Sequence, residues 1–171
     1  MKILPVAGLL ITVLAPWSAA YGATATTSMV NVVTVAGICQ ISSTGFSTTY
    51  DPTGTNLAAN QDTTASVSTT CTSGSAATIT LGQGLHPDTG STDALPLRRL
   101  SNGAGTPGFL SYSLSSDSNR VVPWGNVGAA GMAVVGTGVT VPVTVYARVP
   151  AAQTSAVAGT YTDTVIATIT Y

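Results

Sequence analysis

Few side chains in this sequence could carry out chemistry: two cysteines, one histidine and six acidic residues, all of them aspartates. Two cysteines form a disulfide in an exported chain, or contribute to a metal site elsewhere. A histidine with a serine and an aspartate could hydrolyse an acyl bond, and paired carboxylates could act as acid and base. The chemistries to weigh are therefore a disulfide, a metal site and catalysis.

The two cysteines are Cys39 and Cys71. An even pair in an exported chain is most simply one disulfide, which would close a loop of about 33 residues and contribute roughly 3.5–4 kcal/mol in the chain-entropy model. Zinc needs four ligands at close spacing, but the single histidine, His86, lies alone in the loop sequence GQGLHPDTG. We therefore expect a disulfide, a solvated His86 and no metal site.

Catalysis finds no residues to support it. His86 would be the sole base, and the sequence lacks a nucleophile elbow of the GxSxG type. The aspartates lie mostly in turn contexts, where they cap their own backbone: Asp51, Asp62, Asp88, Asp93 and Asp117. Asp163 differs because it falls within a strand on the inward face, so we expect it near the strand's start, bonded to backbone or to an arginine. We predict no catalytic or cofactor-binding residue, no cofactor and no enzyme.

The charge content is low for a globular domain. Only 6% of the 171 residues are Asp, Glu, Lys or Arg, where about 25% is usual. Besides Lys2 the basic residues are Arg98, Arg99, Arg120 and Arg148, so the chain without Lys2 has 4 − 6 = −2 charges. So few scattered cations cannot form a basic patch, which excludes binding to nucleic acid through its phosphates.

The first 22 residues are typical of a secretory signal peptide. Lys2 precedes the apolar run ILPVAGLLITVLAP, and small residues follow in WSAAYGA, with cleavage after Gly22 or after Ala20. The apolar run is too short for a membrane span of about 20 residues, and Pro5 and Pro16 interrupt it. The sequence therefore predicts an exported protein.

The rest of the sequence alternates with the period of β-strands. Three stretches place apolar residues on one face: 65–71, 77–81 and 110–114. A fourth puts these residues inward: Val139, Val141, Val143, Val145, Ala147 and Val149. Pro142 removes a ladder donor, so this strand should have that position at an edge or a bulge. Two long loops, 83–106 and 115–138, complete the pattern, and Trp124 in the second is either a core plug or a ligand platform. An all-β sandwich or barrel is indicated.

Two further strands, one at each end of the mature sequence, have no obvious hairpin partner. Residues 23–35 combine high β propensity with no turn residue. One face carries Thr27, Met29, Asn31, Val33 and Val35, and the other offers Val30, Val32 and Thr34. Residues 160–171 alternate strictly, with Tyr161, Asp163, Val165, Ala167, Ile169 and Tyr171 on one face. We interpret the two segments as strands that pair between molecules.

Several motifs together resemble one known family. RRLSNG, LSYSLSSDSNR, PWGN, VPVTVYARVP and the ending GTYTDTVIATITY are similar to the spore coat protein U family, which includes subunits of archaic chaperone–usher pili. The resemblance covers about residues 25–171. It implies an immunoglobulin-like sandwich that lacks its last strand, bordered by a groove. A periplasmic chaperone fills that groove during export, and the N-terminal extension of the next subunit replaces it in the fibre, which is a known mode of strand addition.

From this resemblance we expect three parts: a signal peptide (1–22), a donor-strand extension (23–36) and a pilin-like domain (37–171). The donor residues would be Thr27, Met29, Asn31, Val33 and Val35, and the acceptor groove and chaperone contact would include Tyr161, Val165, Ala167, Ile169 and Tyr171. Burying Met29, Val33 and Val35 would stabilise the joint by about 5–9 kcal/mol. Asn31 departs from the family pattern, since an apolar residue is usual there.

The expected function is a structural subunit of a Gram-negative surface pilus that serves adhesion and biofilm formation. Its partners would be other pilus subunits, a periplasmic chaperone and an outer-membrane usher, and it would pass through the periplasm to the cell surface. Two alternatives stay open: a small outer-membrane β-barrel, against which the 6% aromatic content argues, and a secreted monomeric coat or carbohydrate-binding sandwich.

Overall fold

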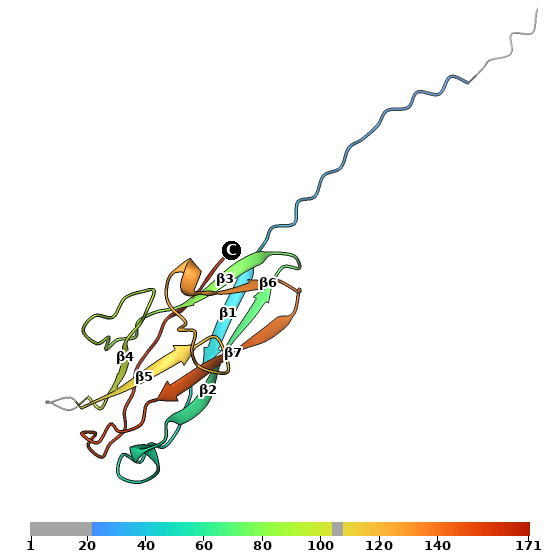
Figure 1. Ribbon diagram of the computed structural model, residues 1–171. Coiled ribbons are helices and arrows are strands. Elements are labelled where there is room, and N and C mark those ends of the chain that lie inside the picture. The colour runs from blue at the N-terminus through green and yellow to red at the C-terminus, as the bar shows by residue number, and fades with distance from the viewer. Residues whose placement is uncertain (1–21, 104–107) are drawn as a thin grey trace, which may run out of the picture. The chain divides into compact units, whose positions relative to one another are not determined.

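The computed structural model describes residues 22–103 and 108–171. The chain divides into two units, Met1–Thr34 and Val35–Tyr171, which are drawn in Figure 1. Within the first unit, residues 22–34 are exposed and form neither helix nor strand. The predicted signal peptide, apart from Gly22, lies outside the described residues.

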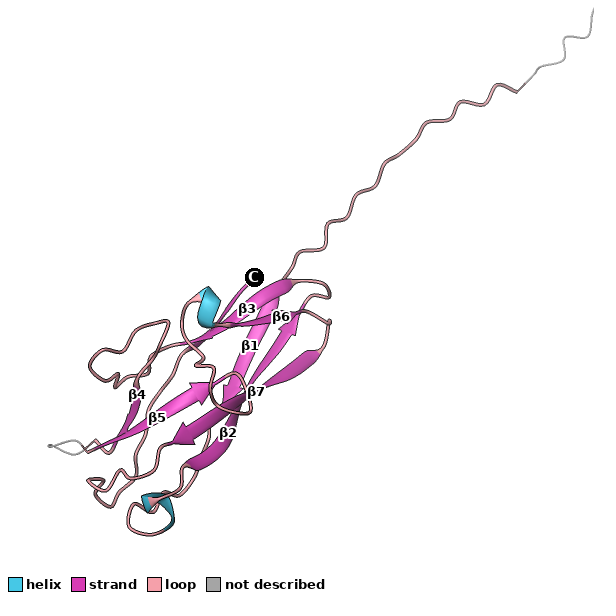
Figure 2. Cartoon of the chain, in the orientation of Figure 1, coloured by secondary structure: helices cyan, strands magenta, loops and turns pink. Residues whose placement is uncertain are grey.

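The second unit consists of two antiparallel sheets. The larger has the strand order β1-β2-β7-β5-β4 and the smaller the order β6-β3-β8. Their bounds are β1 (Cys39–Thr44), β2 (Gln61–Cys71), β3 (Ala76–Leu81), β4 (Arg98–Ser101), β5 (Phe109–Ser115), β6 (Met132–Val135), β7 (Thr140–Val149) and β8 (Ala167–Thr170). Two short 3₁₀ turns, η1 (Thr55–Leu57) and η2 (Gly128–Ala130), accompany them (Figure 2).

The inward faces of the two sheets form one hydrophobic core. Its buried residues are Val67, Ile79, Leu81, Tyr112, Leu114, Trp124, Val145, Ala147 and Val149. The predicted faces of β2, β3 and β5 are therefore confirmed, because period-2 alternation places one side of each strand against the core. The all-β sandwich is confirmed as well.

The prediction for β7 is right in its second half and wrong in its first. Val145, Ala147 and Val149 are buried, whereas Val139 and Val141 are 64% and 37% exposed. The reason is that β5 pairs with β7 only at Tyr146–Arg148, so the first half of β7 has β2 alone as a neighbour. Pro142 falls in this half, opposite Ser68. The edge position expected for Pro142 is therefore confirmed.

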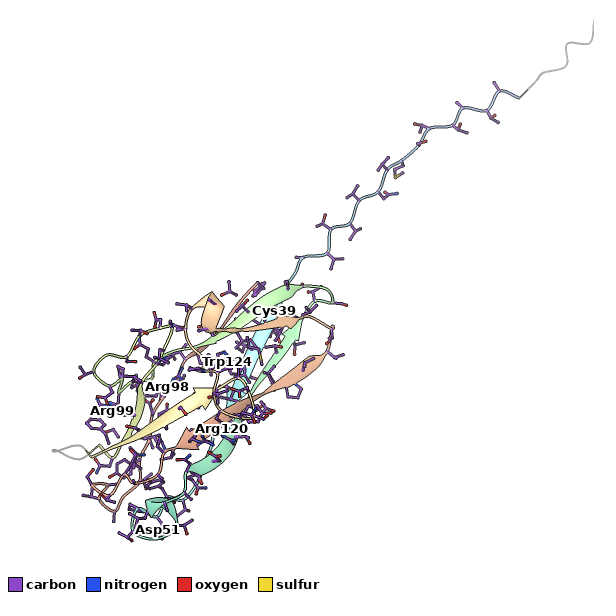
Figure 3. The ribbon with its side chains drawn as sticks, in the orientation of Figure 1. Cys39, Asp51, Arg98, Arg99, Arg120 and Trp124 are labelled. Carbon is purple, nitrogen blue, oxygen red and sulfur yellow. A yellow bond between two sulfur atoms is a disulfide. The ribbon has the colours of Figure 1, made fainter. Side chains whose placement is uncertain are left out.

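The centre of the sandwich holds a tryptophan and an arginine side by side (Figure 3). Trp124 is fully buried, and its indole Nε1 donates to the carbonyl of Ile79 at 2.9 Å. Arg98 is 1% exposed, and its guanidinium donates to the carbonyls of Gly82, Leu81 and Trp124. Trp124 is thus part of the core, so of the two alternatives the core plug is confirmed, and not the ligand platform.

Arg98 also explains why β4 was missed. Residues 98–101 were predicted to lie in the long loop 83–106, which contains Gly, Pro, Asp and Asn, and an arginine is seldom buried. Three carbonyl acceptors satisfy the guanidinium here, which permits burial of a charge. Burial lowers the pKa of Arg98 from its ordinary value, but a guanidinium remains protonated at physiological pH. β6 likewise lies inside the second predicted loop, and β1 was not predicted.

The strand predicted at 160–171 is longer than the ladder that the structure shows, and the strand predicted at 23–35, which was expected to pair with another molecule, stays a prediction. Residues 23–35 form no strand, and only Ala167–Thr170 of the predicted strand 160–171 form a ladder. A strand requires a neighbour that accepts and donates its main-chain hydrogen bonds. In the second unit β8 has β3 as its partner, while Thr162 makes an isolated bridge to Ser101.

Cys39 and Cys71 form a disulfide, as predicted. They are also cross-strand partners, since β1 pairs with β2 in the register Cys39↔Cys71. β1 is the edge of its sheet and is bonded only to β2. The covalent link therefore fixes the first residue of an edge strand.

We predict that replacing Arg98 with methionine strongly destabilises the fold. The change keeps a long unbranched side chain but leaves three carbonyls without their donor, each of which costs about 1–3 kcal/mol. Equilibrium unfolding in guanidinium should show a loss of about 3 kcal/mol or more. Arg148→Met is the control: its exposed bridge to Asp62 should be worth less than about 1 kcal/mol. Equal losses for both variants would contradict this role of Arg98.

We predict that Cys39→Ala/Cys71→Ala lowers the free energy of unfolding by about 2–4 kcal/mol, because the unfolded chain regains the entropy of the closed loop. For a domain of this size the melting temperature should fall by roughly 5–15 °C. Calorimetry of the wild-type chain with and without a reductant supplies the matched measurement. An unchanged melting temperature in both experiments would contradict the expectation.

Candidate strand-accepting groove

A groove of about 830 Å³ opens on one side of the sandwich. One wall is formed by residues 43–52, which continue from β1, and the other by residues 156–163 with Val165 and Ala167. The floor is the hydrophobic core itself. Its floor residues include Ala65, Val67, Leu81, Leu114, Val145 and Val149.

Each wall adjoins an edge strand, and the two edge strands belong to different sheets. β1 is the last strand of the larger sheet, and β8 is the last strand of the smaller one. At one end the walls converge, because Ile169 packs against the cluster of Cys39, Cys71 and Ala77. Further along, no described residue of the chain lies as a strand between the two edges. The core is thus covered there by the two walls alone, and a groove remains between them.

The segment 161–170 presents unused main-chain groups to this groove. Side-chain burial alternates without a break along these residues, so the segment is extended throughout. Thr162 exchanges both hydrogen bonds with Ser101 at 2.9 Å, and the carbonyl of Ile166 accepts from the amide of Gly82 at 2.8 Å. Since successive residues point their polar groups to opposite sides, the amides and carbonyls of the odd-numbered residues face the groove.

The predicted acceptor residues are distributed along this wall. Tyr161, Val165 and Ala167 line the groove. Ile169 lies beyond it, against the core and the disulfide cluster, and Tyr171 is 61% exposed. The structure therefore places three of the five at the groove and two beyond its closed end.

The predicted donor residues lie in the extended N-terminal segment. Met29, Val33 and Val35 are 81%, 89% and 77% exposed, and Thr27 and Asn31 are exposed too. Such a row of exposed apolar side chains is expensive in water unless a partner covers it.

Residues 36–38, at the base of the extension, belong to the second unit and are bonded within it. Thr72 Oγ1 accepts from the amide of Ile38 and donates to the carbonyl of Ala36, both at 3.1 Å. The amide of Thr72 donates to the carbonyl of Ile38 at 2.9 Å. Residues 36–38 are therefore tied down immediately before the disulfide at Cys39.

The wall 43–52 was not identified from the sequence. Phe46 packs edge-on against Tyr112, and the Tyr50 hydroxyl donates to the carbonyl of Pro150 at 2.7 Å. Buried Asn56 accepts from the amide of Asp51 and donates to the carbonyl of Ala59. The stretch TTYDPTGTN could have indicated this wall, because an aspartate and an asparagine in a turn form hydrogen bonds to nearby backbone.

Asp163 lies at the groove wall and is held by two donors. Its Oδ1 accepts from the amide of Leu85 at 2.8 Å, and its Oδ2 accepts from the Tyr112 hydroxyl at 2.6 Å. The backbone bond expected for Asp163 is thus confirmed. Burial, reinforced by the bond to Asp163, raises the pKa of Tyr112 well above its ordinary value. Tyr112 therefore stays protonated and remains a donor.

The other residues considered for chemistry have structural roles. Asp51 and Asp117 accept from backbone amides of their own loops, as predicted, and these bonds lower the pKa of Asp51. The turn predicted for Asp62 is wrong, because Asp62 lies in β2 opposite Arg148. The guanidinium of Arg148 donates to both carboxylate oxygens, and this bidentate bond lowers the pKa of Asp62. His86 is half-buried with its ring 6.0 Å from that of Phe109, not fully solvated.

Two further findings concern the described ranges 22–103 and 108–171. They contain no group of three or more histidine, cysteine, aspartate or glutamate side chains that could hold a metal ion. They also contain no helix with the length and hydrophobicity that crossing a membrane requires.

The arrangement of two sheets with a groove between two unpaired edges defines a class: an immunoglobulin-like sandwich that lacks one strand, as in pilins. The solved complex of the chaperone CsuC with the tip adhesion subunit CsuE, from archaic chaperone–usher pili of Acinetobacter baumannii, is similar at a TM-score of 0.51. The identity is 19%, and the match covers 81% of this chain but 40% of that chain. This likeness shows the fold.

The family follows from the sequence comparisons. The family model of the Spore Coat Protein U domain matches residues 23–168, so the chain belongs to that family. Protein U of Myxococcus xanthus is 47% identical over 165 residues, which cover 92% of this chain and 91% of that protein. The resemblance seen in the motifs is therefore confirmed.

We predict that Tyr112→Phe reduces the dependence of stability on alkaline pH. Tyrosine loses its proton near its ordinary pKa of 10.0 when unfolded, whereas the pKa of folded Tyr112 is raised. The stability due to this residue is therefore complete below pH 10 and is lost as the pH rises further. Unfolding free energies at pH 8–11 should fall less steeply for Tyr112→Phe than for the wild type.

The control for this measurement is Tyr146→Phe, because Tyr146 lies on the outer side of β7 with its ring near Arg120. At pH 7 Tyr112→Phe should also cost about 1.5–3 kcal/mol, the worth of a hydrogen bond to a charged group. Identical pH slopes for the two variants would contradict the argument.

Proposed function

We propose that this protein is the structural subunit of a surface fibre in which the groove of one copy receives the extension 23–36 of another. The observation that carries the proposal is the groove of about 830 Å³ between the edges of β1 and β8. Its floor is the core, and one wall offers unused main-chain donors and acceptors. A β-strand with apolar side chains is the occupant that matches both properties.

The extension has the chemistry of that occupant. It contains no proline or glycine between Ala23 and Val35, and its apolar side chains are exposed. Burial of Met29, Val33 and Val35 would stabilise the joint by about 5–9 kcal/mol, and the ladder hydrogen bonds add to this. An uncovered groove edge would otherwise be a site of aggregation.

The same reasoning supports an assembly route. A subunit with an uncovered groove needs a temporary partner during export, and the solved relative was captured with a chaperone. We propose that residues 1–22 direct export, that a periplasmic chaperone covers the groove, and that an outer-membrane usher assembles the fibre at the cell surface. Adhesion and biofilm formation would be the roles of that fibre.

A coat layer is the second candidate, favoured by the family's name and by the 47% identity to Protein U. A coat built by strand exchange would use the groove in the same way. A monomeric sandwich would instead have to cover the groove with its own residues 23–35. The oligomeric state therefore separates the monomeric function from both assembled ones, and microscopy separates fibres from layers.

We predict that deleting residues 23–35 abolishes assembly of the exported protein. Size-exclusion chromatography and electron microscopy of material secreted from a host with the cognate chaperone and usher would measure it. The deleted variant should still bind the chaperone, since its groove is intact. Fibres formed by the deleted variant would overturn the proposal, and so would a wild-type protein that is a stable monomer.

Paired point variants make the same test without shortening the chain. Val165→Asp places a charge in the groove, whereas Ile166→Asp, on the neighbouring outward position, is 66% exposed in the wild type. The first should reduce assembly more than tenfold, because a buried unpaired charge costs more than about 2 kcal/mol. The second should assemble normally. Equal behaviour of the two would contradict the role of the groove.

A further inference from the structure

Two polar residues interrupt faces that are otherwise suited to apolar contact. Asn31 lies midway along the row Thr27, Met29, Asn31, Val33 and Val35 of the extension. Asp163 lies in the groove wall between Tyr161 and Val165. A polar group opposite an apolar side chain loses its water without a replacement bond. Each residue would be unfavourable alone, but they would satisfy each other if they met.

Asp163 has the capacity for such a bond. Its two oxygens each accept one donor within its own chain, from Leu85 and Tyr112. A carboxylate offers about four lone-pair sites, so each oxygen retains one. Tyr112 and Leu85 fix the carboxylate at the groove wall, and the amide NH₂ of Asn31 supplies two donors. The chemistry of the pair is therefore complementary.

The main chain restricts how an incoming strand can lie. The odd-numbered residues of 161–169 point their side chains inward and their main-chain polar groups to the groove, as the bonds of Thr162 and Ile166 require. An antiparallel strand places residues directly opposite one another on the same face. The odd-numbered donor residues must therefore lie opposite odd-numbered acceptor residues. The registers that keep this face inward differ by steps of two.

We propose that the extension of a second copy runs antiparallel to residues 161–171 with Asn31 opposite Asp163. Met29 then lies opposite Val165, and Val33 opposite Tyr161. Moving the strand by two residues one way puts Met29 against Asp163, and moving it the other way puts Val33 there. Of these three registers, only the proposed one places a polar side chain, Asn31, opposite Asp163. A buried polar pair is a known means of fixing register.

The shape of the groove agrees with this register. Ala25 and Ala23 fall opposite Ile169 and Tyr171, beyond Ala167, where the walls converge on the disulfide cluster. Small side chains suit that narrow end, and Met29 meets the open part. The anchored carbonyl of Ala36 leaves Val35 as the last free residue, opposite Gly159. Residues 27–35 thus cover the groove-lining stretch 159–167, and residues 23–26 reach its narrow end.

This inference rests on the proposed function, and cysteine crosslinking tests the two separately. Val165→Cys is combined in turn with Thr27→Cys, Met29→Cys or Asn31→Cys in the full chain. Residues directly opposite lie about 5.5 Å apart between Cα atoms, within disulfide range, whereas a shift of two residues gives about 7–8 Å. Non-reducing gels of the assembled protein should show covalent multimers at least tenfold more abundant for the Met29→Cys pair.

A dominant crosslink from Thr27→Cys or Asn31→Cys would overturn the register and leave strand exchange standing. Assemblies that lack all three crosslinks would overturn the register too, and a failure of wild-type chains to assemble would overturn the proposed function with it. If Val165→Cys prevents folding, Ala167→Cys takes its place. The expected partner is then Thr27→Cys, against Ala25→Cys and Met29→Cys as controls.

A pair of substitutions that exchanges the two polar residues tests the pair itself. Asn31→Asp would place a carboxylate against Asp163 and should weaken assembly about tenfold or more, since the bond becomes a repulsion. Asp163→Asn in the same chain should restore assembly. The control is Thr27→Asp with and without Asp163→Asn. Because Thr27 does not lie opposite Asp163 in the proposed register, Asp163→Asn should not improve the assembly of the Thr27→Asp variant. An Asn31→Asp variant that assembles like the wild type, or is not rescued, would contradict the pairing.

Discussion

The free edge of β8 is the constraint on which the rest of the structure depends. Its neighbour β3 occupies one side, and the other side turns inward side chains and main-chain polar groups toward the same groove. The domain has therefore buried most of its core, while the main-chain amides and carbonyls along this edge face the groove without a bond to another described residue. Completion by an added strand, as proposed, would satisfy both needs at once, since the strand would supply apolar side chains and a ladder together.

The remaining contacts keep the two walls in place around that line. Arg98 and Trp124 join the carbonyl groups of β3 and its following loop to the core. Tyr50 ties the end of the wall 43–52 to Pro150. The disulfide holds β1 on β2 at the opposite end. The groove is therefore bounded on three sides by segments bonded to the rest of the domain, an arrangement that would preorganise it for the proposed occupant and reduce the entropy lost on binding.

The alternation of apolar and polar residues was sufficient to place the inward faces of β2, β3 and β5, because burial of one sheet face imposes a period of two. The same pattern overestimated β7 at Val139 and Val141, because strand length depends on neighbours that local sequence does not specify. β4 was missed because Arg98 satisfies its charge through carbonyls from three distant positions. The alternation of residues 160–171 predicted a strand that contributes to one wall of the groove. The wall 43–52 was not predicted, since side-chain bonds to backbone form it in place of a hydrophobic pattern.

Thr72 bonds the chain at Ala36 and Ile38, one residue before the disulfide and one residue after Val35. In a fibre of the proposed kind, this leaves almost no slack between an inserted strand and the body of its own subunit. A pull on the fibre would pass from the inserted strand through residues 36–38 to Cys39, and from there across a covalent bond into β2. The edge strand β1 would then be protected from peeling away from β2. Under tension the joint between subunits, and not the fold of a subunit, would be the weakest element. Such a joint could re-form after release.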